Sequence, residues 1–206
     1  MEIGSNKNKL KVGIIVFLGT NCEYDTKRAC DFYGWDSEFI WHKDKIEKKY
    51  DLIIIPGGFS YGDHISSGRI AKLSPAVKSL PVGKSLILGI CNGFQILCES
   101  KLLPGTLMDN QNIKFISKIS QLNFQNELIQ LPIAHHQGNY TCENIDKSQI
   151  IMTYADNENG SDYSIAGLYD RNNKIIGMMP HPERAFFEEL GLTDGRKVFD
   201  FIKGQI

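Results

Sequence analysis

Cys91 lies within residues 89–93, whose sequence GICNG follows an apolar run and precedes a predicted helix. This glycine-x-nucleophile-x-glycine form is that of a nucleophile elbow, in which the flanking glycines allow a sharp turn that projects the side chain. The partial positive charge of a helix N-terminus favours the nucleophilic thiolate. A small cysteine buried at a tight turn fits the same pattern about equally well. Cys91 is therefore a candidate nucleophile whose support has to come from the rest of the chain.

Two further side chains follow on the same predicted helix. Gln95 comes four residues after Cys91, one turn along the same face, where its amide could contact a substrate held at the sulfur. Cys98 comes seven residues after Cys91, two turns along, and we expect it in the core. Gln95 is thus a candidate substrate-binding residue.

His181 and Glu183 lie in residues 178–184, MMPHPER, where a predicted strand ends. A residue before proline favours an extended backbone, so two side chains separated by one residue can point the same way, with the carboxylate orienting the imidazole. The alternative is that Glu183 only opens the final helix while His181 packs near the surface. The carboxyl ends of strands in open α/β sheets are where ligands bind, so His181 and Glu183 are a candidate general acid/base and its orienting carboxylate. Taken without Cys91, this short motif would favour the alternative.

A glycine-rich loop follows another buried strand at residues 56–63, PGGFSYGD. Its adjacent glycines allow backbone N–H groups to approach a ligand and donate to an oxyanion, so Gly57, Gly58 and Phe59 are candidate oxyanion and substrate contacts. An ordinary turn is the alternative. Three separate strand ends then supply a nucleophile, a base with its orienting group, and oxyanion donors, which is the set that a catalytic site requires.

The elements that must position these residues alternate between strand and helix. The predicted strands cover residues 12–17, 37–41, 52–55 and 86–88, and the predicted helices cover residues 21–33, 65–77, 92–102 and 183–199. Residues 106–140 alternate apolar and polar in short pieces, as antiparallel strands do, and 165–169 with 174–179 form a predicted hairpin. Continuous apolar runs are typical of parallel strands buried on both faces. We expect one α/β domain over 1–206, with an open, mostly parallel, flavodoxin-like sheet flanked by helices and a small antiparallel excursion.

Composition narrows the classes of function. The chain has 206 residues, with Lys+Arg 23 against Asp+Glu 24 and a formal net charge of -1, so no global positive field is available for nucleic acid. Five cysteines, an odd number, stand without tight metal-ligand spacing, which indicates reduced thiols and a cytoplasmic protein. No apolar run reaches the length of about 18 residues that suggests a membrane span.

Two adjacent histidines, His135 and His136, could suggest a metal site. No third and fourth ligand stands at a recognisable spacing, so we expect a polar loop there and no metal.

The residues above, with several others, resemble a known family, the glutaminase subunits of phosphoribosylformylglycinamidine synthase, which are class I glutamine amidotransferases. The stretches that carry the resemblance are residues 19–22, 55–63, 88–97, 132–135, 159–161 and 177–185. They occur in order along nearly the whole chain. The sequences GGFSYGD, CNGFQ and MPHPER look specific to this branch of the amidotransferases.

The resemblance implies Cys91 as nucleophile, His181 as general acid/base and Glu183 as its orienting carboxylate, with an oxyanion hole formed by backbone near Gly58 and Asn92. It implies hydrolysis of glutamine to glutamate and ammonia. The ammonia would serve an ATP-dependent conversion of formylglycinamide ribonucleotide to its amidine in purine biosynthesis. The implied partners are a large synthetase subunit, which would hold ATP and magnesium, and a small bridging subunit. No cofactor is implied for this chain.

Three positions depart from the family pattern. Ser66 stands where arginine is usual, and His136 and Gln137 stand in a loop that usually reads HGEG. These departures put substrate contacts or docking in doubt. Two alternatives stay open: a stand-alone cysteine hydrolase or peptidase of related fold acting on another acyl substrate, and a non-catalytic regulatory subunit.

Overall fold

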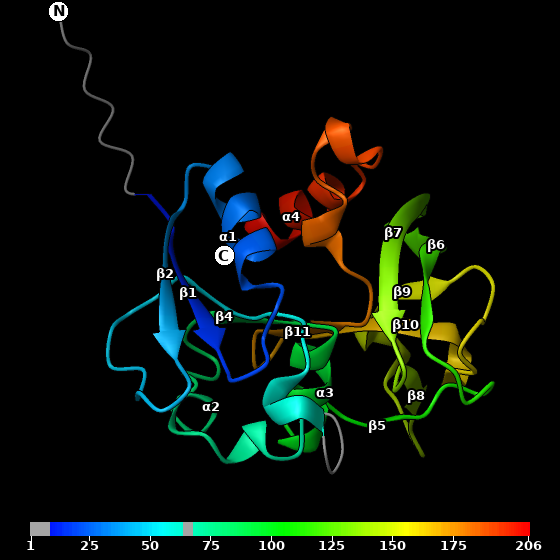
Figure 1. The fold of residues 1–206 in the computed structure, drawn as a ribbon, viewed down its shortest axis with the longest axis horizontal. Coiled ribbons are helices and arrows are strands. Elements are labelled where there is room, and N and C mark those ends of the chain that lie inside the picture. The colour runs from blue at the N-terminus through cyan, green and yellow to red at the C-terminus, as the bar shows by residue number, and fades with distance from the viewer. Residues whose placement is uncertain (1–8, 64–67) are drawn as a thin grey trace, which may run out of the picture.

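The apolar runs form the central strands of a nine-stranded sheet in the computed structural model, which describes residues 9–63 and 68–206 (Figure 1). The sheet has the order β2-β1-β3-β4-β11-β10-β9-β6-β7. Its parallel part consists of β1 (Lys11–Val16), β2 (Asp36–Trp41), β3 (Leu52–Ile55), β4 (Leu86–Ile90) and β11 (Ile175–Met178). Every residue of β3 and β4 is buried, as their continuous apolar runs predict. The order of these five strands is the flavodoxin-like one, so the predicted α/β class is confirmed.

The antiparallel part continues the same sheet. It consists of β10 (Ile165–Asp170), β9 (Ile150–Tyr154), β6 (Ile116–Phe124) and β7 (Glu127–His135). A separate two-stranded sheet pairs β5 (Thr106–Met108) with β8 (Asn139–Thr141). The predicted antiparallel strands within 106–140 and the predicted hairpin of β10 and β11 are both confirmed.

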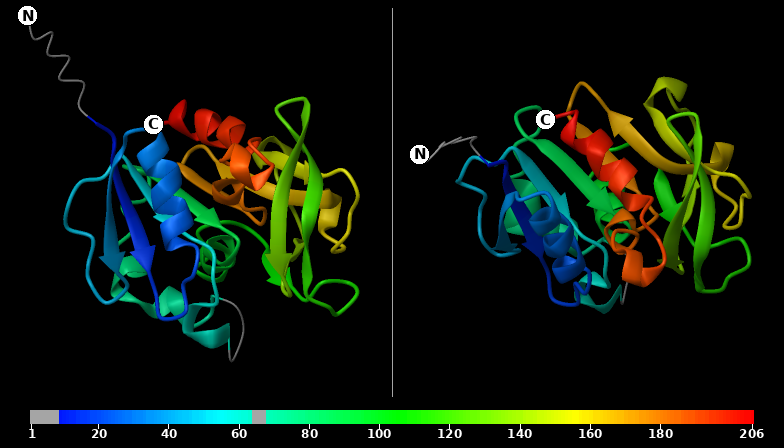
Figure 2. Two further views of the ribbon diagram at one scale, coloured as in Figure 1. Left: turned by 45° about the horizontal axis from the view of Figure 1, so that its top comes forward. Right: turned by 90° about the horizontal axis from the view of Figure 1, so that it is seen from above.

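Helices cover the two faces of the sheet. They are α1 (Glu23–Phe32), α2 (Pro75–Lys78), α3 (Asn92–Glu99) and α4 (Gly195–Lys203). Figure 2 shows α1 and α4 together on one face, with α2 and α3 on the other. The Tyr33 hydroxyl at the end of α1 donates to Asp200 in α4 over 2.7 Å, and the rings of Tyr33 and Phe199 stack. None of the described helices has the length and apolar character needed to cross a membrane.

Two predicted helices are wrong in extent. The described part of the 65–77 helix is a 3-10 turn, Ala71–Leu73, followed by α2, which begins at Pro75. Proline has no N–H for the interior of a helix, and the Ser74 hydroxyl accepts the Val77 N–H to cap the new start. The 183–199 helix is replaced by two 3-10 turns, Pro182–Arg184 and Glu188–Leu190, before α4 begins. Gly191, with φ +80°, ends the second turn in the left-handed region that favours glycine.

Candidate active site

The predicted catalytic residues meet at one edge of the sheet. Gly57 follows β3, Cys91 follows β4 and His181 follows β11, and parallel strands bring their carboxyl ends to the same side. Strand β7 ties two of them together, because the His181 N–H donates to the Pro132 carbonyl over 2.8 Å. The Cys91 Sγ lies 3.7 Å from the Ala134 carbonyl of the same strand. The three strand ends predicted to cooperate therefore converge.

Cys91 occupies a sharp turn between β4 and α3. Its φ of 50° and ψ of -103° are unusual for a residue with a side chain. Such strain costs about 1–3 kcal/mol and persists only where the surrounding structure enforces it. The Cys91 N–H donates to the Met178 carbonyl over 2.7 Å, which joins the turn to β11. The side chain is only 5% exposed. The backbone geometry is that of a nucleophile elbow.

The two glycines of the elbow serve close packing. A Cβ on Gly93 would lie 1.9 Å from the Ile55 carbonyl oxygen of β3, and a Cβ on Gly89 would lie 2.7 Å from the Gly93 carbonyl. Both distances are too short for any other residue. The two glycines are therefore required because α3 passes directly against β4 and against β3, the strand that precedes the glycine-rich loop.

His181 and Glu183 form a buried pair at the 3-10 turn Pro182–Arg184. The His181 Nδ1 and the Glu183 Oε1 are 2.6 Å apart, and each residue is 2% exposed. Burial lowers the pKa of His181, but the charge of Glu183 and interactions with the thiols of Cys91 and Cys22 raise it, and the net pKa lies well above its usual value. The His181 Nε2 has no hydrogen-bond partner within residues 9–63 and 68–206, so this nitrogen is free to exchange a proton with a substrate.

The glycine-rich loop places its backbone groups in different roles. Gly58 pairs with Thr20 in an isolated antiparallel bridge. The hydrogen bonds of this bridge run through Gly57, whose carbonyl accepts the Cys22 N–H, and through Phe59, whose N–H donates to the Gly19 carbonyl over 2.9 Å. The Gly58 N–H therefore points away from the bridge.

Gly57 allows the His181 imidazole to pack directly against the backbone of the glycine-rich loop. A Cβ on Gly57 would lie 2.6 Å from the His181 Cε1 and 3.1 Å from the Cys22 Sγ. Only glycine leaves enough room for the imidazole in its present position.

Asn92 and Gln95 are buried and paired at the start of α3. The Asn92 amide donates to the Gln95 Oε1 over 2.9 Å, and the Gln95 Nε2 donates to the Gln137 carbonyl over 2.6 Å. The Asn92 N–H belongs to the first helical turn, whose N–H groups lack partners inside the helix. Gln95 thus links the nucleophile's helix to the loop after β7.

Cys22 is the residue of the site that sequence reasoning missed. It precedes α1 and is 1% exposed. Its Sγ, a His181 ring nitrogen and a Glu183 carboxylate oxygen all lie within 4.8 Å of one another. Burial and the charge of Glu183 raise the pKa of the Cys22 thiol, although interactions with His181 and Arg184 oppose this. Its place after the first strand, at the same sheet edge, was the available signal.

Among the described residues, Cys22, His181 and Glu183 form a group whose donor atoms lie close enough together to hold a metal ion. The Arg184 guanidinium donates to the Cys22 Sγ over 3.1 Å, and the Glu183 carboxylate is engaged with the imidazole. A cation placed there would face the guanidinium charge. The donor set therefore suits proton transfer better than metal binding.

The adjacent histidines differ from each other. His135 is not in a polar loop as expected, because it ends β7 and is 3% exposed, with its Nδ1 3.0 Å from the Asn110 Oδ1. Burial, with the nearby charge of His181, lowers the pKa of His135 to about 4. His136 does lie in the loop, where its Nδ1 is 3.3 Å from the exposed Asp109 carboxylate.

The positions that depart from the family pattern lie in two places. Ser66 lies outside the described residues. Arg69, beyond it, is exposed and lies 3.9 Å from Glu99. Gln137 donates to the Asp109 carboxylate over 3.0 Å, so an acid from another segment accompanies the loop that lacks its own.

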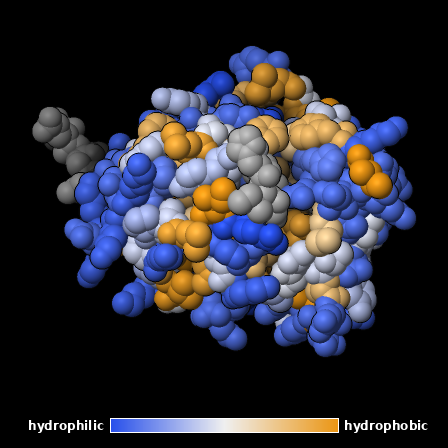
Figure 3. All heavy atoms as spheres, turned by 60° about the horizontal axis from the view of Figure 1, so that its bottom comes forward, coloured by the Kyte–Doolittle hydropathy of each residue, from blue (hydrophilic) through white to orange (hydrophobic). Residues whose placement is uncertain are grey.

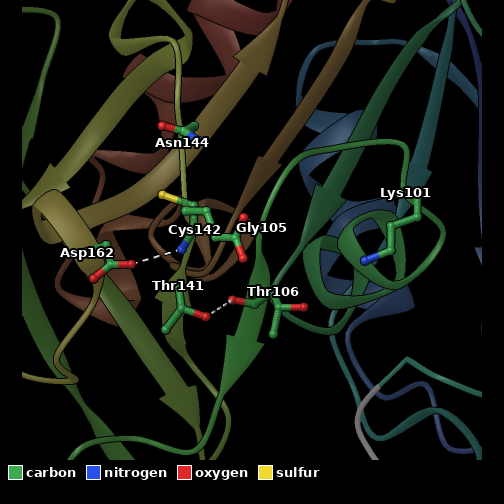
Figure 4. Close-up of a pocket in the computed structure, with 8 residues that line it drawn as sticks. Lys101, Gly105, Thr106, Thr141, Cys142, Asn144 and Asp162 are labelled. Atoms are coloured by element: carbon green, nitrogen blue, oxygen red, sulfur yellow. Dashed lines mark hydrogen bonds between the residues drawn. The ribbon is translucent and has the colours of Figure 1, made fainter.

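The face that carries the strand ends mixes apolar and hydrophilic side chains (Figure 3). Phe59 and Phe115 are 46% and 48% exposed, and their ring centroids are 6.5 Å apart. A separate recess of about 650 Å³ lies at the two-stranded sheet, where the Cys142 N–H donates to Asp162 (Figure 4). None of the predicted catalytic residues lines this recess.

Comparisons of the sequence and of the structure with known proteins agree on the kind of protein that this chain resembles. The family described as CobB/CobQ-like glutamine amidotransferase domain matches residues 9–191. The chain is 42% identical to phosphoribosylformylglycinamidine synthase subunit PurQ of Helicobacter hepaticus, covering 93% of this chain and 96% of that protein. It is 46% identical to the PurQ subunit of Campylobacter jejuni, covering 92% and 94%. Among solved structures, a chain of PurLQS from Thermotoga maritima superposes with a TM-score of 0.87 at 38% identity, covering 95% and 98%.

Proposed function

The chain belongs to the CobB/CobQ-like glutamine amidotransferase domain family, and from this premise we propose that it is the glutaminase subunit of a phosphoribosylformylglycinamidine synthase. Two PurQ subunits at 42% and 46% identity over nearly their whole length support this assignment. The observation that carries the chemistry is the elbow thiol of Cys91 beside a buried His181–Glu183 pair. A non-catalytic subunit has no need for a strained cysteine next to a charged imidazole.

The reaction begins with attack of the Cys91 thiolate on the side-chain amide carbon of glutamine. The C–S bond forms and the carbonyl oxygen becomes an oxyanion. His181 then gives its proton to the departing nitrogen, the C–N bond breaks, and ammonia leaves a glutamyl thioester. Water attacks the thioester while His181 takes up a proton. Glutamate is released and the thiolate is restored.

Glu183 has the role of orienting His181 and stabilising its charged form. Its carboxylate fixes Nδ1 as the protonated nitrogen, because a carboxylate only accepts hydrogen bonds. Nε2 therefore faces the reacting atoms. A charged imidazole next to a thiolate is the state in which a cysteine nucleophile is most reactive.

The oxyanion is assigned to the N–H groups of Gly58 and Asn92. Both come from segments held rigid by the close packing of Gly93 against β3, and Asn92 adds the partial positive charge of the α3 N-terminus. Gln95 is positioned to contact the glutamine substrate once its bond to the Gln137 carbonyl is exchanged for one to the ligand. Phe59 contributes its ring, since its N–H is already used by Gly19.

The ammonia is passed to a synthetase partner that converts formylglycinamide ribonucleotide to the amidine. The solved PurLQS assembly contains a chain of this fold, which supports association with a large synthetase subunit and a small third subunit. ATP and magnesium are assigned to the synthetase. The thiol chemistry of this chain needs no cofactor of its own.

The test is synthesis by the complex of this chain with its synthetase. Cys91→Ala should abolish glutamine-dependent synthesis and leave synthesis driven by added ammonia intact. Cys98→Ala is the matched control, because Cys98 is a buried cysteine of the same helix. Loss of both activities in Cys91→Ala would mean that the cysteine is structural.

A further inference from the structure

Cys22 is a second buried thiol at the catalytic imidazole. Its sulfur lies within 4.8 Å of a ring nitrogen of His181 and a carboxylate oxygen of Glu183. Gly57 completes the packing, because a Cβ there would touch both the His181 Cε1 and the Cys22 Sγ. The sulfur therefore fills the space beside the ring on the side of the glycine-rich loop.

The Cys22 sulfur is held on several sides. The Arg184 guanidinium donates to it over 3.1 Å, and the thiol donates to the Asn21 Oδ1 over 3.1 Å. The Cys22 carbonyl accepts both the N–H and the hydroxyl of Thr26, over 3.0 Å and 2.9 Å. An Asp25–Arg184 ion pair of 3.1 Å fixes the guanidinium in turn. The start of α1 is thereby connected to the residue that follows Glu183.

We propose that Cys22 is a positioning residue, which holds the His181 imidazole against Glu183 for the proton transfers of the glutaminase reaction. The inference rests on the function proposed for His181. Cys22 is not the nucleophile in this scheme, because it lacks the strained elbow of Cys91. Its sulfur acts through the imidazole. It limits the movement of the ring by packing beside it, and it is a polarisable neighbour of the charged imidazole.

The groups that face His181 determine what its titration reports. They are Glu183 on its own turn, Cys91 at the elbow, Cys22 before α1 and His135 at the end of β7. Both thiols and Glu183 favour the charged ring, and burial opposes it. Removing the Cys22 sulfur therefore lowers the pKa of His181, and the charged form is lost at a lower pH.

The experiment measures kcat and KM for glutamine against pH in the complex with the synthetase, for Cys22→Ala, Cys22→Ser and Cys30→Ala. Displacement of a catalytic group by about 1 Å can cost about 100-fold in rate. We expect Cys22→Ala to lower kcat by about 10- to 100-fold with little change in KM. The limb of the pH profile set by His181 should move to lower pH, and ammonia-driven synthesis should be unchanged.

Cys30→Ala is the control for loss of a buried sulfur. Cys30 lies in α1, the helix that Cys22 precedes, and is fully buried. Burial raises the pKa of Cys30 to about 12, and His181 has no part in this shift. Its alanine variant should lose stability yet keep kcat and the pH limb. The hydroxyl of Cys22→Ser can still hydrogen-bond to Asn21 and Arg184, so this variant should recover part of the activity. If the alanine variant does not fold, kcat and the pH limb of Cys22→Ser test the proposal.

A Cys22 variant with the wild-type kcat and pH limb would overturn the proposal, as would an equal shift in Cys30→Ala. Failure of the proposed function looks different. Cys91→Ala would then keep glutamine-dependent synthesis, whatever the Cys22 variants do.

Discussion

Replacing Gly93 with alanine tests whether the contact between α3 and β3 positions the catalytic thiol. The added Cβ would lie 1.9 Å from the Ile55 carbonyl oxygen and 2.8 Å from its carbon, whereas ordinary contact begins near 3.4 Å. The helix must then move by about 1.5 Å, the difference between 3.4 Å and 1.9 Å, since the obstacle is backbone and close-packed interiors do not yield freely. Cys91, two residues earlier, moves with it.

Two effects of this substitution have opposite signs. Alanine inside a helix is favoured over glycine by about 1 kcal/mol, so helix propensity alone predicts a more stable protein. Overpacking of a tight core costs about 1–3 kcal/mol and sometimes more. With a contact as short as 1.9 Å, we take the upper end of that range. The net loss is about 2 kcal/mol, which lowers Tm by about 4–8 °C in a protein of this size.

The assay combines thermal unfolding with glutamine- and ammonia-dependent synthesis. A displacement of about 1 Å at the thiol should lower glutamine-dependent kcat by about 100-fold, while ammonia-dependent synthesis persists. Gly204→Ala is the control, because the nearest atom to its Cβ is the Phe201 carbonyl oxygen at 3.3 Å. A Gly93→Ala protein with raised Tm and wild-type kcat would refute the idea that this packing holds the elbow.

Two further predictions concern the histidines. Glu183→Gln removes the charge that raises the pKa of His181, so kcat should fall by about 100-fold or more and the limb set by His181 should move to lower pH; an unmoved limb would exclude the pairing. His135 has a pKa of about 4 in the folded protein against a usual value near 6.5. Its unfolded form therefore binds a proton first as pH falls, and stability is lost between pH 6.5 and 4, by about 3 kcal/mol. Urea unfolding of His135→Gln should show a correspondingly flatter pH dependence, and equal slopes would contradict the assignment.

The elbow and the His181–Glu183 pair were predictable because each is a short local pattern at the end of an apolar strand. The continuous apolar sequences of β3 and β4 predict buried parallel strands, and parallel pairing brings the carboxyl ends of these strands together. The interpretation of Glu183 as a mere helix opener fails, because its carboxylate is buried against the imidazole. Short-range sequence patterns therefore sufficed for the proposed chemistry.

Cys22 could not be predicted in the same way. Its contacts join the start of α1 to Arg184, a residue 162 positions later, and no local pattern encodes a contact of that kind. The 183–199 helix failed for a related reason. The backbone is extended at Phe187, and the Ala185 carbonyl accepts the Gly195 N–H, ten residues later, over 2.8 Å. In the 183–199 segment, tertiary contacts override local helix propensity.

Cys91 is the proposed nucleophile among five free cysteines. Mass spectrometry after treatment with a glutamine-mimicking alkylator tests this role most directly. Cys142 is the most accessible of the five, and a general thiol reagent should favour it, whereas the glutamine mimic should label Cys91 and glutamine should protect that site. Inactivation accompanied by label on Cys22 or Cys142, with Cys91 unmodified, would show that Cys91 is not the nucleophile.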